Sequence, residues 1–462
     1  MVFLFGSEPD VRMVCHGVVI DESRAGKPKR GLIVSNEPEG VSLSEASAGG
    51  GLPDIHVNTG LTLGALAVGL LAGLAVTRWP VLAPVGVLMA PLGGLWLKGL
   101  EMTILPLVSA LLVVGIVQMM AAASAGKQAI RVLSWIFGIY FASAFFAAVA
   151  MPLLLDLWPV PAAAQGVLAG APGKDAPVPG FGDFLLSLLP SNIFAAAAND
   201  AMLPCVAFFS LLGVAISRLA PVQRGQLTSL FEALAGAMMV MIGWVLWLAP
   251  VGVFALSLDL GARTGAEAIG VLAHYVITVS MMGWAVLAAA PVLALLGARL
   301  ALGSYCRALM PVGAVAISTQ SSLASLPAML TACRKLGISG ASAEFALPLC
   351  VALFRATGPA MNLAVAIYVA KLTGVTLSPA ILVAGAIVAA ITEISSPSLP
   401  GAISFVSAVG PVALAMGVPI APLALLVAVD MLPDITRTVG NVAMDVVVAA
   451  LVDRGARRGE EA

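Results

Sequence analysis

The chain has 462 residues, of which 60% are hydrophobic and only 10% charged, and its formal net charge is −1. This composition is typical of membrane proteins and excludes a water-soluble globular protein. Because the charge is nearly neutral, nothing in the composition indicates a nucleic-acid partner. The five cysteines form no C-x-x-C pair and the three histidines are dispersed, so neither a disulfide framework nor a zinc site is predicted.

Residues 1–57 differ in composition from the rest of the chain. They carry many charges and a glycine triplet and show no helical apolar period, which predicts a disordered cytoplasmic extension. The apolar start at residues 1–5 is too short for the apolar region of a secretory signal. A mis-assigned start codon is the alternative.

Successive apolar stretches after this extension are long enough to cross about 30 Å of hydrocarbon. They cover residues 58–79, 86–120, 130–155, 187–217, 228–258 and 268–298. Each of them predicts a membrane-spanning helix.

Two further apolar stretches, 304–334 and 378–412, are interrupted at their centres. The first contains the polar run 318–327, which ends in a proline, and the second contains the serine- and proline-rich run 395–401. Two half-helices that meet at a polar tip explain such a run, because broken backbone is tolerated at membrane depth where it lines a site. Paired interrupted segments are typical of a transport site near the membrane midplane.

A polar helix face is predicted at 430–445, between the uncharged run 394–429 and the apolar run 446–452. At about 100° per residue, five polar side chains fall within an arc of roughly 80°. They are Asp430, Asp434, Arg437, Asn441 and Asp445. Ionisable groups at mid-membrane cost about 2.5–3.5 kcal/mol each, so they normally face partners, water or ions. This face is the predicted functional site; an amphipathic helix with its polar face in water or paired structurally is the alternative.

The distribution of basic residues predicts the orientation of the chain. Lysines and arginines follow the second, fourth and sixth spans and the first interrupted segment, and more lie in the tail at 453–462. All of them fall on one side if both termini are cytoplasmic. The sequence therefore predicts an all-α integral membrane protein of the cell inner (plasma) membrane, with eight transmembrane helices and two re-entrant helical hairpins related as inverted repeats.

The pattern Asp-x-x-x-Asp-x-x-Arg-Thr-x-x-Asn-Val-x-x-Asp at 430–445 closely resembles the last transmembrane helix of the dicarboxylate/amino acid:cation symporter family, which includes the glutamate transporters. Stretches at 95–108, 189–196 and 248–255 resemble its second, fourth and fifth helices. The resemblance implies a homotrimer in which a transport domain carries the substrate across the membrane along a static scaffold, which is an elevator mechanism.

The resemblance also implies how the chain is divided. The scaffold would comprise helices 1 and 2 at 58–128 and, after a loop, helices 4 and 5 at 159–266. The transport domain would comprise helix 3 at 129–158 and a core at 267–452 that contains helix 6, hairpin 1, helix 7, hairpin 2 and helix 8. The tail at 453–462 would be cytoplasmic.

Roles for individual residues follow from the same resemblance. Asp434 matches the residue that binds the substrate amino group, and Arg437 matches the one that binds a side-chain carboxylate. Carriers of neutral amino acids usually lack this arginine, and carriers of C4-dicarboxylates usually lack this aspartate, so the presence of both favours aspartate or glutamate. The other predicted substrate-site residues are Ser321, Ser322, Gly358, Pro400, Gly401, Thr438 and Asn441.

The seventh helix departs from the family pattern. Phe354-Arg355-Ala356-Thr357-Gly358 stands where the family has the sodium-binding motif Asn-Met-Asp-Gly-Thr. Ile139 and Ala142 likewise stand where the third helix has tyrosine and threonine ligands, although Ser143 is kept. Hard cations need oxygen ligands, which alanine, phenylalanine and isoleucine side chains do not supply. Only the sodium site of Asn441 and Asp445 retains its side chains.

Loss of an aspartate and gain of an arginine make the site more positive by two charges than the family pattern. We expect Arg355 to act as a tethered cation that pairs with Asp434, Asp445 or Asp430 in place of about two sodium ions. Coupling would then use one sodium ion, use protons through a carboxylate such as Glu393 or Asp430, or be absent. Alternatively, Arg355 snorkels or pairs within an inactive site. The family threonine is replaced by Gly358, so the size of the substrate stays open.

Functions other than the transport of acidic amino acids are alternatives for this chain. A sodium-independent or proton-coupled carrier of dicarboxylates or neutral amino acids is one, and a ligand sensor that does not transport is another. A membrane hydrolase using Ser321 or Ser322 with Asp434 lacks a basic partner, since neither interrupted segment contributes a histidine or lysine near the serines. No G-x-x-x-x-G-K-[ST] loop is present, so ATP-driven transport is not expected. We therefore predict no enzymatic activity and no cofactor other than sodium or a proton as coupling ion, with the lipid membrane and a small acidic substrate as partners.

Overall fold

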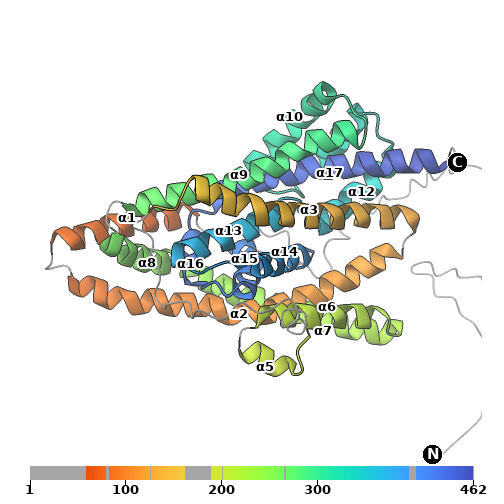
Figure 1. The fold of residues 1–462 in the computed structure, drawn as a ribbon. Helices are drawn as coiled ribbons and strands as arrows, with labels where there is room; N and C mark the ends of the chain where they lie inside the picture. The colour runs from red at the N-terminus through yellow and green to blue at the C-terminus, as the bar shows by residue number, and fades with distance from the viewer. Residues whose placement is uncertain are drawn as a thin grey trace, which may run out of the picture. The chain divides into compact units, whose positions relative to one another are not determined.

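The computed structural model describes residues 59–79, 83–124, 126–161, 189–199, 201–264, 267–394 and 402–460. These residues form helices joined by turns and contain no strand (Figure 1). The predicted extension at 1–57, Pro400 and Gly401 lie outside the described residues. In chain order the helices are α1 (Thr59–Arg78), α2 (Ala83–Ala123), α3 (Lys127–Leu157), α5 (Ile193–Ala198), α6 (Met202–Ser217), α7 (Pro221–Trp247), α8 (Ala249–Thr264), α9 (Glu267–Leu296), α10 (Leu302–Thr319), α11 (Leu326–Lys335), α12 (Gly340–Leu353), α13 (Gly358–Thr373), α14 (Pro379–Glu393), α15 (Ala402–Ala415), α16 (Ala421–Leu426) and α17 (Met431–Glu460).

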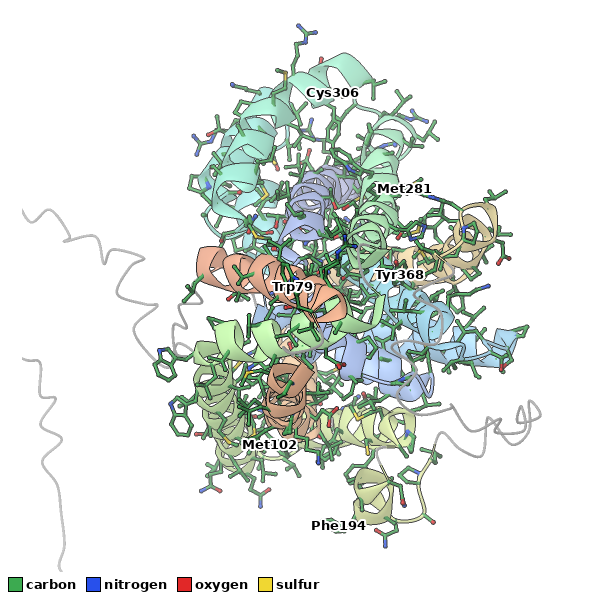
Figure 2. All side chains as sticks on the ribbon, turned by 90° about the vertical axis from the view of Figure 1, so that its left-hand side faces the viewer. Trp79, Met102, Phe194, Met281, Cys306 and Tyr368 are labelled. Atoms are coloured by element: carbon green, nitrogen blue, oxygen red, sulfur yellow. The ribbon has the colours of Figure 1, made fainter. Side chains whose placement is uncertain are left out.

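Six helical segments among the described residues are long and apolar enough to cross a membrane. They are Pro91–Ala123, Lys127–Leu157, Pro221–Trp247, Ile269–Leu296, Gly340–Thr373 and Met431–Arg457. Four shorter apolar helices accompany them, at Gly60–Val76, Met202–Ser217, Ala249–Ala262 and Pro379–Glu393. Figure 2 shows Met102 and Phe194 on the outside of the helices, where their side chains are 57% and 83% exposed. Large exposed apolar side chains are expected where a helix faces lipid rather than water.

The expectation of a single helix over 228–258 is wrong. α7 ends at Trp247 and α8 begins at Ala249, so two helices meet at Leu248. Pro250 explains the position of the break, because proline has no N–H to continue the ladder and is favoured in the first turn of a new helix. The stretch 187–217 is also divided, into the short α5 and the longer α6. Asn192 begins α5 by accepting hydrogen bonds from the backbone N–H groups of Phe194 and Ala195.

The helices contact one another mainly within two groups. The first group contains α1, α2, α6, α7 and α8. The second contains α3, α9, α10 to α15 and α17, and in Figure 1 α9 and α17 run side by side at its centre. Within the first group α1 and α8 approach closely, since a Cβ on Gly261 would lie 2.6 Å from the carbonyl oxygen of Leu70. Small residues of this kind allow close helix packing in membranes.

The predicted interruption of 304–334 is confirmed. α10 ends at Thr319, Gln320 adopts a left-handed conformation with φ of 49°, and α11 begins at Leu326. α10 and α11 then pack against each other and against α17. α14 and α15 also pack against each other, on either side of the second interruption. Both helix pairs therefore belong to the second group.

Candidate functional site

The polar side chains predicted to share one face of the helix at 430–445 lie mostly buried inside the protein, on and just before α17. The Nη1 atom of Arg437 lies 3.6 Å from Asp434 Oδ1 and 3.9 Å from Asp430 Oδ2. Tyr275 on α9 donates a hydrogen bond of 3.3 Å to the other oxygen of Asp430. Arg437 and Asp430 are buried, whereas Asp434 is part-exposed. The aspartate that is predicted to bind a substrate amino group is thus the most accessible charge of the three.

Arg437 has hydrogen-bonding capacity that the described residues do not use. Its Nε and Nη2 atoms, and Oδ2 of Asp430, are buried without a hydrogen-bond partner among them. Nε–H and Nη2–H point along the same edge of the guanidinium, which is the geometry that binds a carboxylate through two parallel hydrogen bonds. A buried polar group left without a partner costs about 1–3 kcal/mol, so this edge is suited to an anionic ligand.

The predicted seventh helix is broken at the position of the altered motif. α12 ends at Leu353 and α13 begins at Gly358, so residues 354–357 are non-helical. Tyr140 on α3 holds the break, because its hydroxyl donates to the Leu353 carbonyl (2.7 Å) and accepts from the Arg355 N–H (2.9 Å). Backbone groups freed by a break at membrane depth must be satisfied inside the protein, and Tyr140 satisfies one at the end of α12 and one within the break.

α17 supports the other end of this break. Asn441 Oδ1 accepts a hydrogen bond of 3.0 Å from the Thr357 N–H and lies 2.8 Å from its hydroxyl, which is also 3.1 Å from the Arg437 carbonyl. Gly440 makes the approach possible, since a Cβ there would clash with the Thr357 methyl group. Asn441, predicted to contact substrate and sodium, therefore also fixes the backbone beside Arg355.

Asp445 is the most deeply buried carboxylate of the face. It is 0% exposed, and neither of its oxygens has a hydrogen-bond partner among the described residues. Arg355 interacts with it electrostatically. A buried ionised carboxylate needs compensating charge. The residue therefore fits one sodium ion held together with backbone carbonyls, a proton, or the charge of Arg355.

An apolar cavity lies beside the part of the third helix where apolar side chains were predicted to replace sodium ligands. Ile139, Ala142 and Ser143 face a cavity of about 250 Å³ between α3, α9 and α17. Val286 and Met444 form part of its opposite wall. The Ser143 hydroxyl donates to the Tyr140 carbonyl of its own helix. This wall offers a hard cation little to bind.

The serines of the first hairpin lie in the turn between α10 and α11. Ser321 and Ser322 are part-buried there. Ser321 Oγ accepts from the Ala324 N–H at 3.3 Å, and the Ser321 carbonyl accepts from Ser325 Oγ at 2.9 Å. Thr438 on α17 donates to the Asp434 carbonyl at 3.0 Å. All three hydroxyl groups keep acceptor lone pairs for a ligand.

Glu393, named from the sequence as a candidate proton-carrying carboxylate, is the last residue of α14 and lies at this site. Its carboxylate lies against Gly358 and accepts a 2.7 Å hydrogen bond from Asn362 Nδ2. Glu393 is the only acidic residue of the stretch 378–412, which was the available signal. Asn362 and Tyr140 gave no comparable signal. With Glu393 included, Arg355 and Arg437 interact electrostatically with four acidic side chains of the site. These acidic side chains offset the two additional positive charges that were expected from the altered motif.

Comparison with known proteins gives the family. The profile of the Sodium:dicarboxylate symporter family matches residues 59–455. The chain belongs to the sodium:dicarboxylate symporter family. This symporter is therefore a multi-pass membrane protein and a secondary transporter, and it is not an enzyme.

Several relatives resemble the symporter over most of their length. The proton/glutamate-aspartate symporter of Escherichia coli is 28% identical over 371 residues, 77% of this chain and 82% of that protein. The neutral amino acid transporter B(0) of Bos taurus is 27% identical, over 78% of this chain and 72% of that protein. The C4-dicarboxylate transport protein 3 of Ralstonia nicotianae is 26% identical, over 85% of this chain and 89% of that protein.

Proposed function

We propose that this symporter carries acidic amino acids, aspartate or glutamate, across the membrane, with reduced or altered cation coupling. The observation that carries the proposal is the Nε and Nη2 edge of Arg437, which has no hydrogen-bond partner among the described residues and belongs to a guanidinium beside the part-exposed Asp434. The arginine edge suits a side-chain carboxylate, and the aspartate suits an ammonium group. Aspartate and glutamate carry both groups on one molecule.

The relatives named above carry three substrate classes between them, so family membership alone leaves the substrate open. One observation favours the neutral amino acid alternative. Glu393 also interacts electrostatically with Arg437, and a tethered carboxylate there competes with the distal carboxylate of an acidic substrate. The unpaired edge of Arg437 favours the acidic substrate nevertheless, because Glu393 leaves both of its nitrogens without a hydrogen bond.

The proposal includes the elevator architecture. Eight transmembrane helices and two re-entrant hairpins would be divided between a scaffold of the first helix group and a transport domain of the second. The division is supported by the contacts, which are more extensive within each group than between them. A homotrimer with both termini in the cytoplasm of the cell inner membrane completes it, on the basis of the resemblance and of the basic residues.

Arg355 is proposed to replace part of the cation coupling. It is part-buried in the break between α12 and α13 and interacts electrostatically with Asp434, Asp445 and Glu393. A guanidinium is always charged, so it can balance these carboxylates without a bound ion. The remaining coupling would use one sodium ion at Asn441 and Asp445, protons through Glu393 or Asp430, or none, which would leave an exchanger.

Uptake of radiolabelled L-aspartate and L-glutamate into proteoliposomes tests this function, with a sodium gradient, a proton gradient or neither. We expect uptake that is indifferent to sodium and is abolished in Arg355→Met, because that variant leaves buried carboxylates uncompensated. Lys371→Met is the matched control, since Lys371 pairs with Asp156 at the surface. Steep dependence of the wild type on sodium would contradict the tethered-cation proposal. Absence of uptake under every gradient would point to another substrate or to a sensor.

A further inference from the structure

His274 is a buried histidine outside the site described above. It lies in the second turn of the span Ile269–Leu296 and is 4% exposed. Both of its ring nitrogens have partners, because Nε2 lies 3.2 Å from the Trp158 carbonyl oxygen and Nδ1 lies 3.2 Å from the Tyr368 hydroxyl. Trp158 follows the last residue of α3, and Tyr368 belongs to α13. Three elements of the second group therefore hold the imidazole.

The chemistry of these partners determines where the ring protons lie. A carbonyl oxygen only accepts, so the contact with Trp158 requires a proton on Nε2. The Tyr368 hydroxyl has one proton and two places for it, since it also lies 3.0 Å from the Val271 carbonyl oxygen and donates to it. When Tyr368 donates to Val271, its oxygen accepts from Nδ1–H and the imidazole is a cation. When Tyr368 donates to Nδ1 instead, the imidazole is neutral.

The ring of His274 is thus paired in both protonation states. Rotation of one hydroxyl group switches between them, and neither ring nitrogen loses its partner. The Val271 carbonyl lies inside α9, where the helical hydrogen bond satisfies it when the hydroxyl turns away. A buried imidazolium loses hydration, which two hydrogen bonds to oxygen acceptors offset in part. This arrangement suits a site that takes up and releases a proton.

The titratable and charged groups around His274 leave its charge free to change. Tyr368 is the titratable side chain in direct contact with it. On the elements packed against the ring, the nearest charged residues along the chain are Asp156 on α3 and Lys371 on α13, and these two pair with each other at 2.9 Å. The ring itself is hydrogen-bonded to a carbonyl and a hydroxyl, so no carboxylate fixes it as a cation.

Two tyrosines link His274 to the transport site. The ring of Tyr368 packs against both His274 and Tyr275, with centroid separations of 5.6 Å and 5.4 Å. Tyr275 donates the hydrogen bond to Asp430, which lies 3.9 Å from Arg437. Both tyrosines are 0% exposed, so a change at one end of this chain acts on closely packed groups. Binding of a proton at His274 and of a ligand at Arg437 can therefore favour each other.

The location of the cluster also fits proton uptake. It lies where α3 ends and α9 begins. In the proposed orientation, Lys127 and Arg131 place the start of α3 on the cytoplasmic side, so this end faces outward. Trp158, which covers the ring, is 42% exposed. The imidazole is thus one side chain away from the outer aqueous phase.

We propose that His274 is the binding site of the coupled proton in this symporter. Uptake places one proton on Nδ1 while Tyr368 moves its own hydroxyl proton to the Val271 carbonyl, and release reverses both steps. The inference rests on the proposed function and deepens it, because it assigns the proton to a histidine rather than to Glu393 or Asp430.

A direct test uses the full-length protein with His274 as its only histidine. The chain has three histidines, so His16→Gln/His56→Gln leaves His274 alone and its partners unchanged. The nitrogen NMR signals of isotopically labelled histidine, measured in detergent without substrate, report the protonation of each ring nitrogen. We expect a neutral ring protonated at Nε2 to gain a second proton as the pH falls from about 8 to about 5. A ring that keeps one protonation state across this range would overturn the proposal.

The same measurement tests the part played by the hydroxyl. Tyr368→Phe, made in the single-histidine protein, should keep the ring neutral through this range, because Nδ1–H would have no acceptor. Tyr305→Phe is the matched control, since Tyr305 is also buried and its hydroxyl donates to the Ala443 carbonyl instead. Identical titrations in the two variants would overturn the hydroxyl switch.

Coupling is measured as aspartate accumulation in proteoliposomes with the membrane potential clamped. One proton carried per aspartate supports about tenfold accumulation across a gradient of about one pH unit. The wild type should reach this level, and His274→Gln should equilibrate aspartate without accumulating it. Accumulation that persists in His274→Gln, or a wild type that ignores the proton gradient, would overturn the proposal.

The two measurements separate this proposal from the proposed function. If no aspartate moves under any gradient, the substrate assignment fails, and the NMR titration still decides whether His274 binds a proton. If aspartate is transported but the ring stays neutral, the proton site fails and the proposed function stands. Because the titration keeps His274 and its partners, it does not depend on whether His274→Gln folds.

Discussion

Arg437 lies near two aspartates through one nitrogen of its guanidinium, and the opposite edge is buried with hydrogen-bonding capacity that the described residues do not use. Its Nη1 lies near Asp430 and Asp434, while its Nε and Nη2 are buried without a hydrogen-bond partner in the part of the chain that the structure describes. The two aspartates hold the guanidinium plane, so that little side-chain entropy is left to lose when a carboxylate binds. If the substrate carboxylate binds this edge as proposed, we expect recognition to depend on the planar fork as well as on the charge.

Arg437→Lys tests this dependence. Lysine keeps the charge but offers a single flexible ammonium in place of two parallel donors. We expect the KM for L-aspartate to rise on the order of 100-fold, corresponding to about 2–3 kcal/mol for charge-assisted hydrogen bonds. The measurement is the concentration dependence of uptake in proteoliposomes. Arg457→Lys, which changes an exposed arginine near the C-terminus, should leave the KM unchanged. An equal KM in both variants would show that the substrate carboxylate binds elsewhere.

A single side chain, that of Tyr140, supports the break between α12 and α13. Tyr140 is 0% exposed, and its hydroxyl serves one backbone group at the end of α12 and one within the break. Without it, the Leu353 carbonyl and the Arg355 N–H would be buried without partners, at about 1–3 kcal/mol each. The position of Arg355 therefore depends on α3, which is far away in the sequence.

Tyr140→Phe should destabilise the protein by about 2–4 kcal/mol, because two backbone groups lose their partner at once. Thermal unfolding in detergent measures the loss. Tyr305→Phe is the matched control, since Tyr305 is equally buried but its hydroxyl serves a single carbonyl, that of Ala443. We expect the Tyr140 variant to unfold at the lower temperature of the two. Equal unfolding temperatures would mean that the break is held by other contacts.

The sequence predicts elements well where the signal is local. The polar run at 318–327 marks the break after Thr319, and the period of 430–445 places the polar face of α17. Pro250 and the Gly358-Pro359 pair were local signals that the predicted spans did not use, since proline is favoured in the first turn of a helix. The contact between Glu393 and Gly358 could not be predicted, because it joins elements that only the tertiary fold brings together.

The same limit applies to the candidate site. Charge and period identified Asp430, Asp434, Arg437 and Asp445, because ionisable groups at membrane depth are rare. Asn362 and Tyr140 are ordinary residues in apolar helices, and their roles depend entirely on which side chain faces them. The motif at 354–358 alone therefore could not give the charge balance of the site, because the balance also depends on side chains that other helices bring to it.

At the scale of the whole molecule, an elevator mechanism requires the two helix groups to move past each other. Their contacts include α2 with α15, where a Cβ on Gly410 would lie 3.1–3.7 Å from three side-chain atoms of Ile104. This close approach makes the two positions candidates for a pair of cysteines, for which a disulfide requires a Cβ separation of about 3.5–4.5 Å. A covalent link there would join a helix of the proposed scaffold to a helix of the proposed transport domain.

We expect the Ile104→Cys/Gly410→Cys variant to lose uptake when oxidised and to regain it on reduction, while it still binds aspartate in both states. The link stops relative movement of the groups but leaves the site on α17 and the break before α13 untouched. The two single-cysteine variants control for oxidation elsewhere. Cys15 and the exposed Cys306 are changed to serine in these variants. Uptake by the cross-linked protein at the unlinked rate would exclude movement of α15 along α2. Transport would then have to proceed by smaller local motions around a site that stays in place.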